Sequence, residues 1–327
     1  MAQIRFIDAL REGIAAEMRD DPRVFVLGED VAVGGAFGVT AELVEEFGSG
    51  RVLNTPISED TIMGLAVGAA VAGKRPIVEI MFMDFMTLAM SQLVNHAAKL
   101  HYMSGGQLNV PMVVRVQQGA QGGWGSQHSQ SLEAWLAHVP GLKVVAPATA
   151  ADAKQLVRAA VRDESPVVFI EHRGLYFRED ADGAGPADSL GLDKARIVRE
   201  GSDVTLVSYS RALVETLAAA DVLAGRGVSA EVVDLRSLAP IDLDTILTSV
   251  EKTNRLAVVH EAVVQGGLGA EIAAQVQEAA FDLLDAPIMR IGAPYAPPPA
   301  SPVLEAAFVP NMDVIVAAVE RMLGAAT

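Results

Sequence analysis

The sequence predicts an α/β protein built from two doubly wound domains. Three observations lead to this fold class. The chain has 327 residues, which is longer than most single domains and suggests two. In both halves, short apolar runs rich in β-branched residues alternate with helical segments. Between the halves, residues 174–202 are rich in glycine, aspartate and alanine and show no sustained period, which is typical of a connecting segment.

The first domain is expected over residues 1–185. It opens with "MAQIRFIDALREGIAAEMRDD", which has the periodicity of an amphipathic helix. Buried strands are expected at "VFVLGED", "RPIVEIMF", "PMVVRVQ", "LKVVAPAT" and "PVVFIEH", and helices at "TLAMSQLVNHAAKLHYM" and "AADAKQLVRAAVRD". Such alternation is the signature of a parallel sheet with helices on both faces.

A linker is expected over residues 186–202 and the second domain over residues 203–327. Here strands at "DVTLVSYS", "SAEVVDLRS", "RLAVVHEA" and "APIMRIGAP" alternate with helices at "ALVETLAAADVLAGRG", "DLDTILTSVEKTN" and "GLGAEIAAQVQEAAFDLL". This second βα series predicts another doubly wound domain.

Charge and composition exclude several classes of function. The chain has 25 basic and 41 acidic residues, a net charge of −16, which argues against binding of nucleic acid phosphates. The absence of cysteine excludes disulfides, thiolate metal sites and cysteine nucleophiles. The apolar stretch near residues 62–73 is too short to span a bilayer, and the N-terminus lacks the apolar region of a signal peptide. We therefore expect a cytoplasmic protein that does not associate with membranes.

Glycine-rich turns occur at "VAVGGAFG" and "VVQGGLGAE". Neither has the spacing of a dinucleotide-binding turn, and the chain contains no P-loop sequence. These glycines are therefore expected to serve turns and close approaches between elements.

One acid stands ahead of an apolar helix in "NTPISEDTIMGLAVGAAVAGKRP". Ser58 can cap this helix, and Glu59 falls in its first turn, where the helix dipole favours an acid by about 0.3–1 kcal/mol. The helix is apolar all round and is expected to be buried, with Gly64 and Gly68 allowing another backbone to approach. An acid at the N-terminus of a buried helix is partly desolvated and needs a hydrogen-bonding or charged partner.

At this motif the sequence resembles a known family, the β subunits (E1β) of thiamine-diphosphate-dependent 2-oxo acid and acetoin dehydrogenases. Glu59, followed by Gly64, Leu65 and Gly68, is similar to the family's motif on the pyrimidine side of the cofactor, with Ala69 where glutamine is common. Further matches are "EIMFMDF", "NHAAKLHYMSGG", "SQHSQSLEAWLAHVPGLKVVAPAT", "RDESPVVFIEHRGLY" and "DLRSLAPID". The resemblance implies a pyrimidine-binding thiamine diphosphate domain followed by a transketolase C-terminal-like domain.

The resemblance also implies roles for four residues. Glu59 is the carboxylate beside pyrimidine nitrogen N1′ that drives the cofactor into its reactive tautomer. Met81 and Phe85 line the pyrimidine ring, with ordinary core packing at a strand end as the alternative. His128 is an active-site histidine that stabilises charge or relays protons, with a solvated loop histidine as the alternative. The bulky Trp124 departs from commoner versions of this loop, which leaves the shape of the substrate pocket open.

The family resemblance also implies binding sites for metal ions. The family often holds a structural potassium ion, for which the matching positions are Met112, Ala160, Val161, Asp163 and Ser165. Ser165 stands where asparagine is frequent, and a turn-forming aspartate is the alternative reading of Asp163. The family's Gly-Asp-Gly motif for Mg²⁺ does not occur in this chain. A separate α subunit is therefore expected to hold Mg²⁺ and the diphosphate, with thiamine diphosphate shared between the subunits of an α2β2 heterotetramer.

The expected function is that of an E1β subunit of a pyruvate-type or acetoin dehydrogenase complex. Such an oxidoreductase decarboxylates a small 2-oxo acid or cleaves acetoin and then acylates a lipoyl group on an E2 acyltransferase. Two alternatives remain open. One is a transketolase-like or α-hydroxyketone-cleaving enzyme subunit that acts without E2, and the other is a non-catalytic α/β scaffold.

Overall fold

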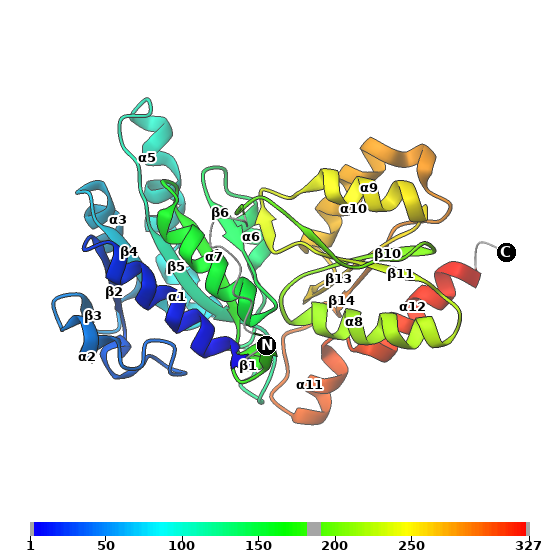
Figure 1. The fold of residues 1–327 in the computed structure, drawn as a ribbon, viewed down its shortest axis with the longest axis horizontal. Coiled ribbons are helices and arrows are strands. Elements are labelled where there is room, and N and C mark those ends of the chain that lie inside the picture. The colour runs from blue at the N-terminus through cyan, green and yellow to red at the C-terminus, as the bar shows by residue number, and fades with distance from the viewer. Residues whose placement is uncertain (1–2, 182–190, 325–327) are drawn as a thin grey trace. The chain divides into compact units, whose positions relative to one another are not determined.

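The computed structural model describes residues 3–181 and 191–324, which pack as two compact α/β units (Figure 1). Most of the N-terminal half forms the first unit, which runs up to Gln118 and resumes over Trp135–Leu192. The second unit contains Gly119–Ala134 and the chain from Asp193 onward. The boundary predicted at residue 185 lies outside the described residues. The assignment of Gly119–Ala134 to the second unit is a feature that the local sequence pattern did not indicate.

In its described residues, the first unit contains eight strands and the helices that connect them. The N-terminal amphipathic segment forms α1, which lies beside α7 (Figure 1). The elements up to the end of the first long stretch are β1 Gln3–Arg5, α1 Phe6–Asp20, β2 Val24–Gly28, η1 Val31–Val33, α2 Leu43–Phe47, β3 Val52–Asn54, α3 Glu59–Val71, β4 Arg75–Ile80, η2 Met83–Phe85, α4 Met86–Met90, η3 Ser91–Ala97, α5 Ala98–Met103 and β5 Val113–Gln118. The rest are α6 Glu133–Ala137, which begins just before this unit resumes, β6 Lys143–Val145, α7 Ala150–Arg162, β7 Val167–His172, η4 Arg173–Leu175 and β8 Glu179–Ala181.

Six of these strands form a parallel sheet in the order β6-β7-β5-β4-β2-β3. Strands β2, β5 and β7 are buried along their whole length, which explains why they are continuous apolar runs in the sequence. A short antiparallel pair, β1 with β8, lies apart from this sheet. The predicted parallel α/β architecture is therefore confirmed for the first unit.

The second unit is a sheet between two pairs of helices. The sheet order is β14-β13-β10-β11-β9, and Figure 1 shows α9 and α10 on one side of it and α8 and α12 on the other. The elements are β9 Arg196–Arg199, β10 Val204–Ser208, α8 Ser210–Gly225, β11 Ala230–Asp234, β12 Ser237–Ala239, α9 Leu243–Thr253, β13 Leu256–Val263, α10 Leu268–Ala280, η5 Phe281–Leu283, β14 Met289–Ala293, α11 Pro302–Phe308 and α12 Met312–Gly324. This confirms the second doubly wound series.

The predicted linker differs from the structure in one respect. Residues 186–190 of it lie outside the described part of the chain, but residues 196–199 form β9, which pairs antiparallel with β11. The β9 strand is half-buried along its length and carries charged residues at both ends. An edge strand of this kind lacks the long apolar run by which the sequence pattern identifies buried strands.

Helix α3 is not buried on all sides, although its sequence is apolar all round. Its buried residues are Ile62, Met63, Ala66, Val67 and Ala70. Leu65 is 50% exposed, and a side chain placed on Gly68 would meet nothing within 4 Å. The expectation of complete burial is thus wrong for this chain on its own. Local hydrophobicity indicates that a face must be covered but not which chain covers it.

The apolar stretch Pro302–Gly324 is long enough to cross a bilayer by length and composition. It is divided into α11 and α12 around Pro310, and α12 packs against α8 through its apolar face. The buried residues of α12 are Ile315, Val316, Ala318, Val319 and Met322, which is the pattern of an amphipathic helix packed on a globular unit.

Candidate active site

The carboxyl ends of β2 and β4 mark the point at which the chain reverses direction across the first sheet. From β2 the chain continues to β3 on one side, and from β4 it continues to β5 on the other. Ligands of open α/β sheets bind preferentially at such topological switch points. Glu29 follows β2 directly and Met81 follows β4 directly, so the switch point carries an acid and an apolar side chain.

Glu59 begins α3 close to the end of β2. The Thr55 N–H donates to the Gly28 carbonyl at 3.0 Å, which ties the entry of α3 to that strand. Ser58 occupies the predicted N-cap position, but its hydroxyl donates to the Thr61 hydroxyl at 2.9 Å and not to the helix backbone. The first turn of α3 therefore leaves its N–H groups uncapped by Ser58 beside the half-buried Glu59.

Glu29 and Glu59 form a pair of interacting carboxylates. Burial raises the pKa of Glu29 above its ordinary value, and the negative charges of Asp30 and Glu59 raise it further. A neighbouring negative charge disfavours the ionised form of Glu29. The sequence did not predict Glu29 as a site residue. Its only local signal is its place directly after a buried strand, which many surface acids share.

Phe85 and Met81 present half-buried apolar surface at the same edge. The Phe82 ring packs edge-on against Phe85 with centroids 5.4 Å apart, and Phe37 packs edge-on against Phe82 at 6.0 Å. This cluster fixes the orientation of the Phe85 ring, because edge-to-face pairs restrict rotation and contribute about 0.5–1.5 kcal/mol each.

A buried ionic network lies beneath this edge. Arg115 of β5 donates to Glu79 of β4 at 2.6 Å and to both carboxylate oxygens of Glu171 of β7 at 2.7 and 2.9 Å. The Tyr176 hydroxyl donates to Glu171 at 2.7 Å. Because removing one member of a buried ion pair costs about 3–5 kcal/mol, this network fixes the three central strands relative to one another.

Unpaired polar atoms remain next to this network. Both side-chain amide atoms of Gln117 are buried and have no hydrogen-bond partner among the described residues. At the entry of α3, the Thr55 hydroxyl is likewise buried without a partner among these residues. Gln117 and Met81 line a cavity of about 10 Å³, the size of one water molecule. An acid, an oriented aromatic ring and unsatisfied polar groups at one sheet edge fit a heteroaromatic ring that carries nitrogen atoms.

His128 belongs to the second unit, unlike Glu59, Met81 and Phe85. It is half-buried, and its backbone N–H donates to the Gly125 carbonyl at 3.2 Å. The centroid of its ring lies 6.2 Å from that of the Trp124 ring, and the two ring planes meet at 42°. The structure therefore brings the three first-unit residues to one edge and places the histidine on a loop of the other unit.

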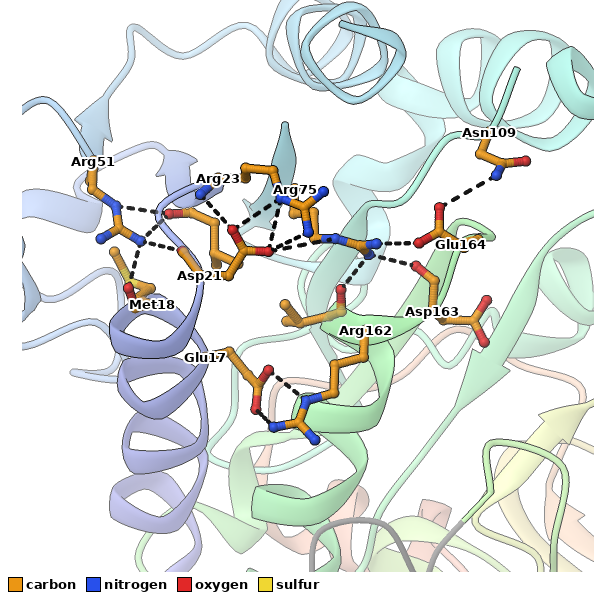
Figure 2. Close-up of polar contacts among 12 residues, drawn as sticks. Glu17, Met18, Asp21, Arg23, Arg51, Arg75, Asn109, Arg162, Asp163 and Glu164 are labelled. Atoms are coloured by element: carbon orange, nitrogen blue, oxygen red, sulfur yellow. Dashed lines mark hydrogen bonds and ion pairs between the residues drawn. The ribbon is translucent and has the colours of Figure 1, made fainter. Parts of the chain in front are cut away.

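Three of the residues predicted to bind potassium lie beside cationic side chains, and Figure 2 shows Asp163 next to Arg75. One guanidinium nitrogen of Arg75 donates to the Val161 carbonyl at 2.9 Å and to the Asp163 carbonyl at 3.0 Å. Lys143 pairs with the Asp163 carboxylate, whose other oxygen accepts from the Ser165 N–H at 2.8 Å. These oxygens do converge on positive charge, but in this structure the charge comes from the protein.

The other two predicted potassium ligands take part in ordinary backbone bonds. The Met112 carbonyl accepts from the Val167 N–H at 2.9 Å, and the Ala160 carbonyl from the Asp163 N–H at 3.3 Å. Within residues 3–181 and 191–324, no group of three or more histidine, aspartate or glutamate residues could hold a metal ion. A carbonyl oxygen keeps a second lone pair, so the potassium site stays a prediction.

Two family models match the chain. "Transketolase, pyrimidine binding domain" matches residues 2–178, and "Transketolase, C-terminal domain" matches residues 193–315. A solved split-gene transketolase, described as an inactive β4 tetramer, has a TM-score of 0.80, with 98% of each chain covered at 23% identity. This structural likeness supports the fold.

Curated relatives are closer in sequence. A mitochondrial pyruvate dehydrogenase E1 component subunit beta-2 from Oryza sativa subsp. japonica is 46% identical over 96% of this chain and 85% of its own length. The pyruvate dehydrogenase E1 component subunit beta of Gracilaria tenuistipitata var. liui is 44% identical over 99% and 100%. The acetoin:2,6-dichlorophenolindophenol oxidoreductase subunit beta of Bacillus subtilis is 46% identical over 98% and 97%.

Proposed function

Because the chain belongs to the E1β family, the β subunits of thiamine-diphosphate-dependent pyruvate and acetoin dehydrogenases, we propose that Glu59 activates thiamine diphosphate for oxidation of a small 2-oxo acid or acetoin. The observation that carries this proposal is the position of Glu59, which begins α3 where the Thr55 N–H ties the helix entry to the end of β2, at the switch point of the first sheet. The names of relatives that are 44–46% identical over almost the whole chain support the reaction class.

The residues of this chain would then divide the chemistry among them. Thiamine diphosphate, when bound, supplies a carbon nucleophile that attacks a carbonyl group and takes up the electrons of the broken bond. Glu59 holds a proton at pyrimidine nitrogen N1′, and Glu29 provides a second carboxyl group at the same switch point. Met81 and Phe85 pack against the ring and exclude water. His128 donates or accepts a proton at the substrate oxygen.

A separate α subunit completes this proposal. The chain has no Gly-Asp-Gly motif, so Mg²⁺ and the diphosphate are assigned to that partner. The exposed part of α3, with Leu65 and Gly68, is the proposed contact surface, and Leu88 of the adjoining α4 extends it, being 60% exposed. The assembly is proposed to be an α2β2 heterotetramer in the cytoplasm that passes its acyl group to a lipoyl E2. A potassium ion at the Asp163 corner remains an optional part of the proposal.

Replacement of Glu59 by glutamine tests the catalytic role. The chain is co-expressed with an α subunit of the same family, and reduction of an artificial electron acceptor is followed with pyruvate, 2-oxoisovalerate and acetoin. Because Glu59→Gln cannot hold the proton at N1′, we expect kcat to fall by roughly 100-fold or more. The matched control is Asp60→Asn, since Asp60 is exposed on the same helical turn and accepts a 3.2 Å hydrogen bond from the Gln92 side chain. Equal activity of wild type and Glu59→Gln would contradict the proposal.

The acyl acceptor separates the E1β reading from a transketolase-like enzyme that works alone. Product formation is compared with and without a lipoyl domain and with an aldose phosphate acceptor. Turnover that requires the lipoyl domain supports the dehydrogenase. Full turnover with the sugar acceptor alone would support the transketolase-like alternative.

A further inference from the structure

A buried carboxylate of the second unit holds a glycine-rich loop that precedes His128. This loop, residues 119–126, belongs to the second unit. One carboxylate oxygen of Glu305 in α11 accepts the Gly122 N–H at 3.0 Å. Both of its oxygens lie 3.1 Å from the Gly123 nitrogen and share that N–H. The Glu305 side chain is only 8% exposed, so it has exchanged most of its hydration for these N–H groups.

The backbone conformation of the loop points both N–H groups at Glu305, and glycine is the residue that best adopts this conformation. Gly122 and Gly123 have φ values of 91° and 73°, in the left-handed region. A β-carbon on Gly123 would lie 2.9 Å from the Ala300 carbonyl oxygen. Consecutive N–H groups in such a turn form a concave nest that binds an anion, and here the anion is the Glu305 carboxylate.

Two further contacts hold the same loop. Glu261 of β13, which is 7% exposed, accepts the Ala120 N–H. The Ser126 hydroxyl donates to the Pro298 carbonyl at 2.8 Å. The loop is therefore bonded at its start, its middle and its end to one β-strand, one helix and the segment before that helix.

The chain beyond His128 is anchored as well. Glu133 is completely buried and accepts from the Tyr209 hydroxyl at 2.7 Å. Tyr209 in turn stacks on the buried His260, with ring centroids 6.4 Å apart. His128 thus lies between two anchor points, while its own ring stays half-buried beside Trp124.

We propose that Glu305 is a positioning residue for His128, because its carboxylate fixes the glycine nest from which the histidine loop extends. This inference rests on the proposed catalytic role of His128. Glu305 touches backbone only and does not itself transfer a proton. Its negative charge matters because an N–H bond to a carboxylate is about twice as strong as one to a neutral acceptor.

A glutamine at this position keeps the shape but not the function. Its carbonyl oxygen can take the place of Oε2, which accepts both glycine N–H groups, but its NH₂ group would replace Oε1 and face the Gly123 N–H, donor against donor. Glu305→Gln also removes the negative charge, so it should weaken the hold on the nest. Glu215→Gln is the matched control, because Glu215 lines the same cavity as Glu305 and accepts the Met312 backbone N–H at 3.1 Å and an Arg211 nitrogen at 2.8 Å, but accepts no hydrogen bond from loop residues 119–126.

Trp124 reports on the loop directly. In a Trp135→Phe background it is the only tryptophan of the chain, and it is 48% exposed. In the α/β complex, Glu305→Gln should lower the fluorescence anisotropy of Trp124, and Glu215→Gln should leave it unchanged. Should Glu305→Gln fail to fold, Gly123→Ala disturbs the nest from the loop side, with Gly227→Ala as its control, since Gly227 has φ of 83° but open space around it. Unchanged anisotropy in both nest variants would overturn the inference.

Activity then tests whether the loop acts through the histidine. We expect Glu305→Gln to lower kcat of the complex by roughly 10- to 100-fold. In a His128→Ala background the same substitution should have little further effect, because interacting residues are not additive. A full additional loss in that background would refute the positioning role. Wild-type activity of His128→Ala would refute the proposed role of His128 and this inference with it, whereas the Glu59 test would be unaffected.

Discussion

His260 is fully buried in the second unit, where three glycines surround its ring. A β-carbon on Gly267, Gly269 or Gly292 would come within 2.7–2.9 Å of ring atoms. The Nδ1 atom donates to the Ala262 carbonyl at 3.1 Å, since that oxygen can only accept. Nε2 is buried without a hydrogen-bond partner among the described residues. Two of the glycines come from "VVQGGLGAE", so their expected use in close approaches is confirmed.

This environment predicts a stability that depends on pH. Burial lowers the pKa of His260 from 6.5 to about 4; the bond to Ala262 opposes this, and the charge of Arg290 adds to it. Above pH 6.5 both folded and unfolded chains hold the neutral ring, so the unit has its full stability. Between pH 6.5 and about 4 only the unfolded chain takes up the proton, and stability falls by about 1.4 kcal/mol per pH unit, about 3 kcal/mol in all.

Urea unfolding at pH 7 and pH 4.5 measures this effect. His260→Asn keeps a donor for Ala262 and cannot titrate, so its unfolding free energy should fall less on acidification than that of the wild type. The exposed His138 supplies the control His138→Asn, which should behave as wild type. An equal pH dependence in wild type and His260→Asn would show that His260 does not titrate in this way.

At the scale of single elements, α3 combines two functions in thirteen residues. Its first residue is Glu59, and its buried side packs against β4 and α4. Its other side exposes Leu65 and the bare backbone at Gly68. An apolar helix face with a glycine at its centre permits a second backbone to come close, which is the geometry proposed for the α-subunit contact.

Enlarging this glycine separates folding from assembly. Gly68→Met meets open space within the chain and removes a poor helix former, so the β subunit should fold and be slightly more stable, by about 1 kcal/mol. It should nevertheless fail to form the complex with the α subunit, as measured by size-exclusion chromatography of co-expressed chains. Gly225→Met in α8, which also meets nothing within 4 Å, should assemble normally. Normal assembly of Gly68→Met would place the subunit contact elsewhere.

At the scale of the whole chain, the sequence predicted what depends on local pattern. Continuous apolar runs identified the buried parallel strands, and the motif from Glu59 to Gly68 identified the start of α3. The pattern missed β9, because a half-buried edge strand has no apolar run, and it missed the membership of Gly119–Ala134 in the second unit. That membership depends on contacts with Glu261 and Glu305, more than 130 positions along the chain. Isolated acids such as these and Glu29 carry no local signal that distinguishes them from ordinary surface acids.

Exchange of the thiazolium C2 proton of thiamine diphosphate for deuterium tests the role of Glu59 most directly. The reconstituted α/β complex is loaded with cofactor without substrate, mixed with deuterium oxide, quenched with acid and analysed by NMR. Glu59 should accelerate this exchange through pyrimidine N1′, so Glu59→Gln should slow it by roughly 100-fold or more while Asp60→Asn leaves it unchanged. Exchange at the wild-type rate in Glu59→Gln, with the cofactor shown to be bound, would contradict the account.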